Sequence, residues 1–153
     1  MAPSAAESDG PIGAVEGSLT AVVLRSVTVT RSTHDDALDR VRSICMAFPE
    51  VTERASHGSP AWFVRDKKTI AMFLDDHHGD GRLAIWCAAE PGVQVSLVAS
   101  DPEVFFVPAY VGHRGWVGVS LDKGLGWDEV GEILEDAFRH VAPAKLIAQL
   151  DDA

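Results

Sequence analysis

Hydrophobic residues recur at helical spacing in two long stretches of the chain. The first stripe consists of Leu38, Val41, Ile44, Cys45 and Phe48. Such spacing is typical of an amphipathic helix with one buried face. Thr33 is expected to cap this helix with its hydroxyl, and Asp35 and Asp36 suit the positive end of the helix dipole. Pro49 is expected to end it.

A second long helix is expected over residues 127–141. Its buried face would comprise Val130, Ile133, Leu134, Ala137 and Val141. Two shorter helices are also expected, one over residues 91–99 and one beginning at Pro143, because proline is well tolerated in a first helical turn. Val93 and Val95 make the first of these short segments a weak helix former.

Strands are indicated between the helices by runs of β-branched and aromatic residues. They are expected over residues 61–65, 69–75, 82–88 and 116–121. A loop through Gly58-Ser59-Pro60 leads into them, and Lys67-Lys68 and residues 78–81 supply the turns of an antiparallel meander. This order of elements predicts an α+β fold, a two-layer sandwich with an antiparallel sheet and helices packed on one face.

Alternation along the strands divides the sheet residues between two faces. The set assigned to the helix side is aliphatic: Ile70, Met72, Leu74, Leu83, Ile85, Cys87, Val117, Val119 and Leu121. The set assigned to the open side is aromatic and small: Ala71, Phe73, Arg82, Ala84, Trp86, Trp116, Gly118 and Ser120. A solvent-facing sheet surface ordinarily carries more polar residues, so the open side is expected to bind a partner or ligand.

Length and composition are those of an ordinary single-domain protein. Of the 153 residues, 46% are hydrophobic and 24% charged. No apolar run reaches the length of about eighteen residues that a membrane span needs, and the start lacks the features of a secretory signal. We expect a cytoplasmic protein in which residues 1–33 are a flexible extension and residues 34–153 form the domain. Within the extension, residues 19–30 could add a strand.

The net charge of −10 limits the classes of partner. Thirteen Lys and Arg residues stand against 23 Asp and Glu residues. Affinity for nucleic acids grows with the number of phosphates that basic side chains neutralise. Because the field of the whole molecule repels a polyanion, any DNA-binding surface would have to be a local cluster of basic residues.

Residues 108–117 hold the densest group of candidate binding residues. Within seven positions the segment contains Tyr110, His113, Arg114 and Trp116. Gly112 and Gly115 allow the backbone to bend sharply between them. An aromatic and cationic loop that leads into a strand is typical of a binding surface.

Several segments, taken in order and spacing, resemble the MmcQ/YjbR family. They are Phe48-Pro49, Gly58 to Arg65, Lys67-Lys68, Asp101 to His113 and Trp116-Val117. The match covers roughly residues 34–150. The resemblance implies a CyaY-like α+β fold and a DNA-binding role, carried by strands and turns arranged as a double wing. The acidic leader of residues 1–33 lies outside the family pattern.

The first functional hypothesis is DNA binding through this strand-and-wing surface. Its basic residues would be Arg54, Arg65, Lys67, Lys68, Arg82 and Arg114. They would contact phosphates while nearby tryptophans stack on bases. The alternative is that Lys67-Lys68 is a solvated hairpin turn and that the arginines protect a sheet edge.

The second hypothesis is a cleft for a small molecule or a protein partner. Its residues would be Phe73, Trp86, Tyr110, His113, Arg114 and Trp116. Arg114 would supply the charge for a small anionic ligand. The same aromatic residues could instead complete a second small core or form a homodimer interface, so monomer and homodimer both stay open.

Catalytic and metal-binding motifs receive little support. The sequence has no nucleophile elbow, phosphate-binding loop or dinucleotide fingerprint. Cys45 and Cys87 stand among apolar neighbours and are expected to be reduced core residues. Residues 75–80 are rich in Asp and His, but adjacent side chains point in alternating directions, so a polar surface turn is favoured over a metal site. We expect a non-enzymatic protein without a cofactor or metal.

Overall fold

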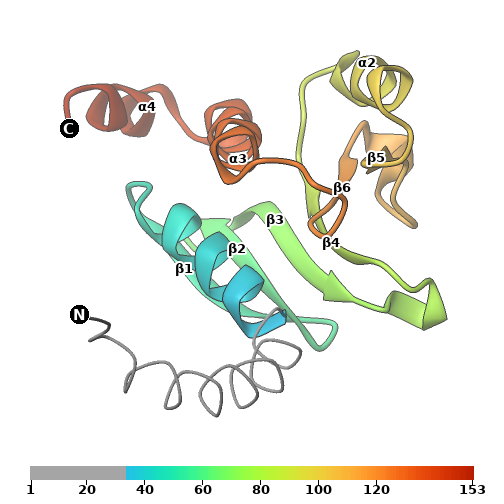
Figure 1. The fold of residues 1–153 in the computed structure, drawn as a ribbon. Coiled ribbons are helices and arrows are strands. Elements are labelled where there is room, and N and C mark those ends of the chain that lie inside the picture. Colours follow the sequence, from blue (N-terminus) through green and yellow to red (C-terminus); the bar gives the residue numbers. More distant parts are fainter. Residues whose placement is uncertain (1–33) are drawn as a thin grey trace, which may run out of the picture. The chain divides into compact units, whose positions relative to one another are not determined.

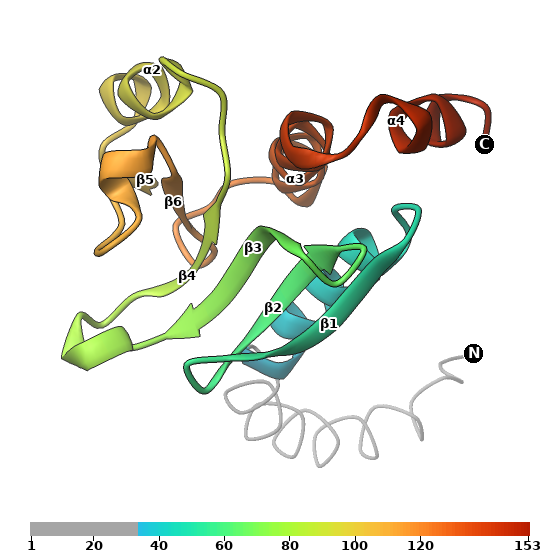
Figure 2. The ribbon, with the colours of Figure 1, turned by 180° about the vertical axis from the view of Figure 1, so that it is seen from behind.

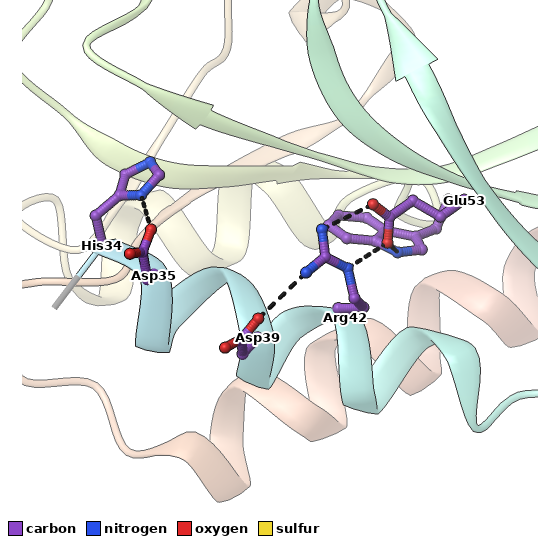
Figure 3. Close-up of polar contacts among 6 residues, drawn as sticks. His34, Asp35, Asp39, Arg42 and Glu53 are labelled. Carbon is purple, nitrogen blue, oxygen red and sulfur yellow. Dashed lines mark hydrogen bonds and ion pairs between the residues drawn. The ribbon is translucent and has the colours of Figure 1, made fainter. Parts of the chain in front are cut away.

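The structure is a computed structural model and describes residues 34–153. The expected extension over residues 1–33, its strand at residues 19–30 and the helix cap at Thr33 lie outside the described residues. Ala37–Ala153 form one compact unit. Of the second unit, Met1–Asp36, residues 34–36 are described and are helical, and the Asp35 carboxylate lies 3.4 Å from the His34 ring nitrogen Nδ1 (Figure 3).

A six-stranded antiparallel sheet is the centre of the compact unit. Its strands are β1 (Val51–Ser56), β2 (Ser59–Val64), β3 (Lys68–Asp75), β4 (Leu83–Cys87), β5 (Phe105–Phe106) and β6 (Val117–Ser120). They lie in the order β1-β2-β3-β4-β6-β5, and every neighbouring pair is antiparallel. The four expected strands are all present, with ends shifted by at most two residues.

Four helices accompany this sheet in the described residues. They are residues 34–46, α2 (Val93–Ser100), α3 (Trp127–Val141) and α4 (Ala144–Asp151), with short 3-10 turns at η1 (His77–Gly79) and η2 (Gly112–Arg114). The first helix lies in front of β1 and β2 in Figure 1 and behind them in Figure 2. The α+β sandwich with an antiparallel sheet is confirmed. No helix between residues 34 and 153 has the length and apolar character needed to cross a membrane.

The core lies between the sheet and the helices. Val41 and Cys45 of the first helix are fully buried, and Phe48 stacks on Phe138 of α3 with ring centroids 4.9 Å apart. Phe138, which the sequence pattern had not assigned to the buried face, is fully buried, and a buried side chain of this size contributes about 1.5–3 kcal/mol to stability. The helical periodicity therefore located the buried faces of both long helices correctly, except that it missed Phe138 of α3.

The expected loop before the first strand is wrong, because residues 51–56 form β1. The strand pairs with β2 through a two-residue turn in which His57 has a φ of 51° and Gly58 a φ of 82°. Two left-handed residues match the twist of a hairpin, but His-Gly lacks the usual asparagine or aspartate at its first position. Pro60 is tolerated because it stands near the start of β2.

The face assignment of β3 is also wrong. Ala71 pairs with Cys87 and Phe73 with Ile85, so Ala71 and Phe73 share the helix-covered face with these two residues. Met72, which pairs with Trp86, lies on the open face instead. The assignment failed because a shift of one residue in register exchanges the two faces of a whole strand.

An ion pair ties the first helix to the sheet (Figure 3). Arg42 donates two hydrogen bonds to Glu53 of β1, from Nε at 2.7 Å and from Nη2 at 2.9 Å. The indole N–H of the buried Trp62 donates to the same carboxylate at 3.0 Å, and Asp39 accepts from Arg42 at 3.2 Å. The hydrogen bond from the Arg42 guanidinium holds the pKa of Glu53 below its ordinary value.

We expect Glu53→Gln to lower the free energy of unfolding at pH 7 by about 1–3 kcal/mol, because charge-assisted hydrogen bonds are lost. Since the folded state lowers the pKa of Glu53, the stabilisation is present above the unfolded value of about 4.3 and is lost as pH falls through the folded value. The difference between the two proteins should therefore shrink towards strongly acid pH. Urea unfolding between pH 7 and pH 3 measures it.

Glu50→Gln is the matched control. Glu50 pairs with Arg65 at 2.9 Å, but both side chains are about half exposed, and such surface pairs contribute about 1 kcal/mol or less. Equal losses of stability in the two variants would contradict the role assigned to the Arg42–Glu53 pair.

Candidate functional site

A pocket of about 680 Å³ opens on the sheet face away from the helices. Its floor is formed by Met72 and Leu74 of β3, Trp86 of β4 and Trp116, which precedes β6. Pockets that hold small molecules measure about 300–1,000 Å³ and have mostly apolar linings. Size and floor both agree with a ligand site.

One wall of the pocket is the turn after β3. The ring of His77 meets the ring of Trp86 edge-on, with centroids 4.9 Å apart, and also lies 6.1 Å from the ring of Tyr110. The Nε2 atom of His77 is buried and has no hydrogen-bond partner among residues 34–153. His78, with a φ of 51°, completes this wall. The turn therefore adds two imidazoles to an aromatic cluster.

A second wall, adjoining the first, comes from the loop between β5 and β6. Tyr110 and Arg114 line the pocket from this loop, and the Arg114 guanidinium lies 5.5 Å from the centroid of the Trp116 ring. Gln94 of α2 fixes the loop by donating to the carbonyl oxygens of Gly112 at 2.8 Å and Trp116 at 2.6 Å. A side chain at Gly112 would meet Val107, so the tight loop requires glycine there.

A third side is polar and comes from the β1–β2 hairpin and the start of β3. Its lining residues are Ser56, His57, Ser59 and Thr69. Hydroxyl and imidazole groups can both donate and accept hydrogen bonds. The pocket thus combines an apolar floor with a partly polar rim.

A second hollow, of about 460 Å³, lies between α2 and α3 and has a different character. Its lining includes four carboxylates: Glu90, Glu129, Glu132 and Asp136. No residue of the described chain that lines the larger pocket is Asp or Glu. The two hollows therefore differ in the sign of charge that they accept.

The residues proposed for the aromatic cleft are only partly brought together. Trp86, Tyr110, Arg114 and Trp116 line the pocket. His113 is exposed on η2 and is not among the lining residues. The placement of Phe73 in the cleft is corrected, because Phe73 is 2% exposed and lies on the helix-covered face.

Sequence reasoning missed several lining residues. Met72 and Leu74 were lost through the error in the faces of β3. His77 had been considered only as a metal ligand, and His57 had no signal in the sequence, since strand pairing alone brings its hairpin to the pocket.

The basic residues of the DNA hypothesis fall into separate places. Arg54 pairs with Asp66 at 2.7 Å and stacks over the Phe63 ring, and Arg65 pairs with Glu50. Exposed Lys67 and Lys68 lie beside them at the β2–β3 hairpin.

Two further basic residues lie elsewhere. Arg82 follows the far end of β3, where its carbonyl oxygen accepts from Asp76 at 2.8 Å, and its guanidinium lies over the Phe106 ring at 3.9 Å. A strand rises about 3.3 Å per residue, so Lys68 and Arg82 are separated by roughly 23 Å along β3. Arg114 belongs to the pocket wall. The six residues do not form one continuous patch.

The acidic turn after β3 uses its carboxylates within the turn. Asp76 accepts from the backbone of Gly81 at 2.7 Å and Asp80 from that of Arg82 at 2.9 Å. Within residues 34–153 no group of three metal-ligating side chains comes together. Cys45 and Cys87 are free and buried, and burial raises the pKa of both thiols.

Comparison with known proteins decides the family. The model of the YjbR family matches residues 46–140, more than half of the chain. The chain belongs to the YjbR family.

The fold of this YjbR protein is shared with a solved structure. Protein DR2400 of Deinococcus radiodurans, described as a DUF419 domain, is similar with a TM-score of 0.58 and 20% sequence identity over 68% of this chain and 77% of that chain. An identity this low supports the fold alone. The sequence matches no curated protein. A shared fold does not fix function, which depends on the residues of the pocket in this YjbR domain.

Beside the pocket, an aromatic ring packs directly against a glycine of the sheet. A side chain at Gly118 of β6 would overlap the Phe106 ring, and Arg82 covers the same ring. Only glycine lets β5 and the Arg82–Phe106 pair approach β6 this closely.

We expect Gly118→Ala to lower the free energy of unfolding by about 1–3 kcal/mol, because the Phe106 ring must move. Gly131→Ala is the control. Gly131 lies in α3 with open space around it, so alanine there should raise stability by about 0.5–1 kcal/mol. Thermal unfolding of both variants checks the prediction, and a Gly118→Ala protein as stable as the wild type would refute it.

Proposed function

We propose that this YjbR protein binds a small organic ligand in the pocket on the open sheet face, and that it acts by binding and not by catalysis. The observation that carries the proposal is the aromatic floor and wall formed by Trp86, Trp116 and Tyr110. Aromatic side chains give a ligand large contact areas, and the polar rim can orient it.

The backbone at Tyr110 supports this choice. Tyr110 has a φ of 66°, which is unfavourable for a bulky residue, and its side chain is 70% exposed. Strained residues cluster at ligand sites, where the fold holds them in place for function. Here the strain places an aromatic ring at the mouth of the pocket.

A binding role fits the chemistry of the pocket better than catalysis. Both cysteines lie in the core, and a thiol with a raised pKa is a poor nucleophile at neutral pH. Among the described lining residues, no serine or threonine hydroxyl lies in hydrogen-bond contact with a histidine, which is the arrangement an activated nucleophile needs.

The test uses the four tryptophans as reporters. Phenyl phosphate, benzyl alcohol and benzylamine are titrated separately into the ¹⁵N-labelled full chain, and indole signals are followed by NMR. We expect at least one of these compounds to shift the signals of Trp86 and Trp116 but not that of Trp62, which is fully buried in the core. Tyr110→Ala should weaken that binding about 3–10-fold, the range of an aromatic contact.

His113→Ala is the matched control, because His113 is exposed on the same loop but does not line the pocket. It should leave the affinity unchanged. If no ring compound shifts Trp86 or Trp116, the proposed function is wrong.

DNA binding is the second candidate, favoured by the exposed Lys67 and Lys68 at the β2–β3 hairpin. Neighbouring Asp66 and Glu50 neutralise the arginines beside them, and the net charge of −10 opposes a polyanion. We therefore place this role behind ligand binding.

Fluorescence anisotropy with single- and double-stranded DNA at two salt concentrations tests the second candidate. If it is correct, Lys67→Glu with Lys68→Glu should weaken binding and reduce its salt dependence. Lys123→Glu with Lys145→Glu gives the same change of net charge elsewhere on the surface and should have a smaller effect. Equal effects of the two double variants would indicate general charge repulsion and no binding surface at the hairpin.

A further inference from the structure

The charge of the pocket lining differs from that of the rest of the protein. Acidic residues make up 23 of the 153 positions, yet the described residues that line the pocket include none. The hollow between α2 and α3 shows the opposite composition, with four carboxylates. Among the described residues, an anion that enters the larger pocket meets no carboxylate on its walls, although the molecule as a whole is negative.

Arg114 gives the pocket a fixed positive charge. Arg42, Arg54 and Arg65 are each paired with a carboxylate, whereas Arg114 forms no ion pair within the described residues and lies against the Trp116 ring. A guanidinium can donate two parallel hydrogen bonds to a carboxylate or a phosphate. Its donors at the pocket wall are therefore available to an anionic group.

The aromatic part of the pocket favours a planar ring beside that anionic group. Trp86, His77 and Tyr110 form adjoining ring surfaces, against which a flat ligand can stack or pack edge-on. The buried Nε2 of His77 has no partner within the described chain, and an unpaired buried polar atom is costly. A polar atom of a ligand could pair with it.

We infer that the ligand of this pocket is an aromatic anion, a planar ring that carries a phosphate or carboxylate group. Arg114 binds the anionic group, and Trp86, His77 and Tyr110 contact the ring. This inference rests on the proposed function and adds to it the chemical class of the ligand.

The experiment compares five probes on the full chain: phenyl phosphate, benzoate, inorganic phosphate, benzyl alcohol and benzylamine. Affinities are taken from the indole signals of Trp86 and Trp116. We expect phenyl phosphate or benzoate to bind at least about ten-fold more tightly than the two uncharged or cationic ring compounds and than inorganic phosphate, because only the aromatic anions use both halves of the site. The better of the two identifies the anionic group.

Variants separate the two halves of the site. Arg114→Gln should weaken the better anion about ten-fold and leave benzyl alcohol unchanged, while His113→Ala should change neither. Arg114 is exposed, so the variant is expected to stay folded, which the remaining NMR signals verify.

The outcomes distinguish this inference from the proposed function. If benzyl alcohol or benzylamine binds as tightly as the aromatic anions, the ligand class is wrong while the pocket remains a ligand site. The same conclusion follows if Arg114→Gln does not weaken the binding of the aromatic anions. If inorganic phosphate binds as tightly as phenyl phosphate, the requirement for a ring is wrong. If no probe shifts Trp86 or Trp116, both proposals fail.

Discussion

The pairing register of β3 decides which side chains reach the open face of the sheet. Between β2 and β3 the register shifts by one residue, so that Trp62 pairs with Ala71 but Phe63 with Thr69. An extra residue of this kind is a β-bulge. Because side chains alternate along a strand, the bulge moves the residues before it to the opposite face of the sheet from the one that simple alternation would give them. The bulge lets Thr69 and Met72 both line the pocket, although they are three positions apart.

On the face of the sheet opposite the pocket, side-chain contacts hold the helices in place. The Arg42–Glu53 pair and the Trp62 indole bond hold the first helix to β1 and β2, and Phe48 stacks on α3. On the other face, the loops that carry Tyr110 and His77 line the pocket together with Trp86 and Trp116, which are 4% and 5% exposed. The well-exposed aromatic ring at this site is that of Tyr110, and an exposed aromatic side chain at a pocket suits a ligand.

The helices and the fold class could be predicted from the sequence because the apolar residues within 38–48 and 127–141 recur with the 3.6-residue period of an α-helix. Trp86, Tyr110, Arg114 and Trp116 could also be found, three of them because they are close in sequence. β1 could not, because its hairpin turn uses His57-Gly58. The β3 face depends on a bulge that leaves no mark in composition, and His57 reaches the pocket only through pairing of distant segments.

The distribution of basic residues favours the proposed ligand binding of this YjbR domain over a DNA surface. Affinity for DNA requires several unpaired cations along one path, but here Arg54 and Arg65 are neutralised by neighbours and Arg82 lies about 23 Å along β3 from Lys68. A small anion requires a single guanidinium and walls without competing carboxylates. Arg114 and a lining that has no Asp or Glu among residues 34–153 meet that requirement even in a protein with a net charge of −10, since local groups outweigh distant, screened charge at contact distance.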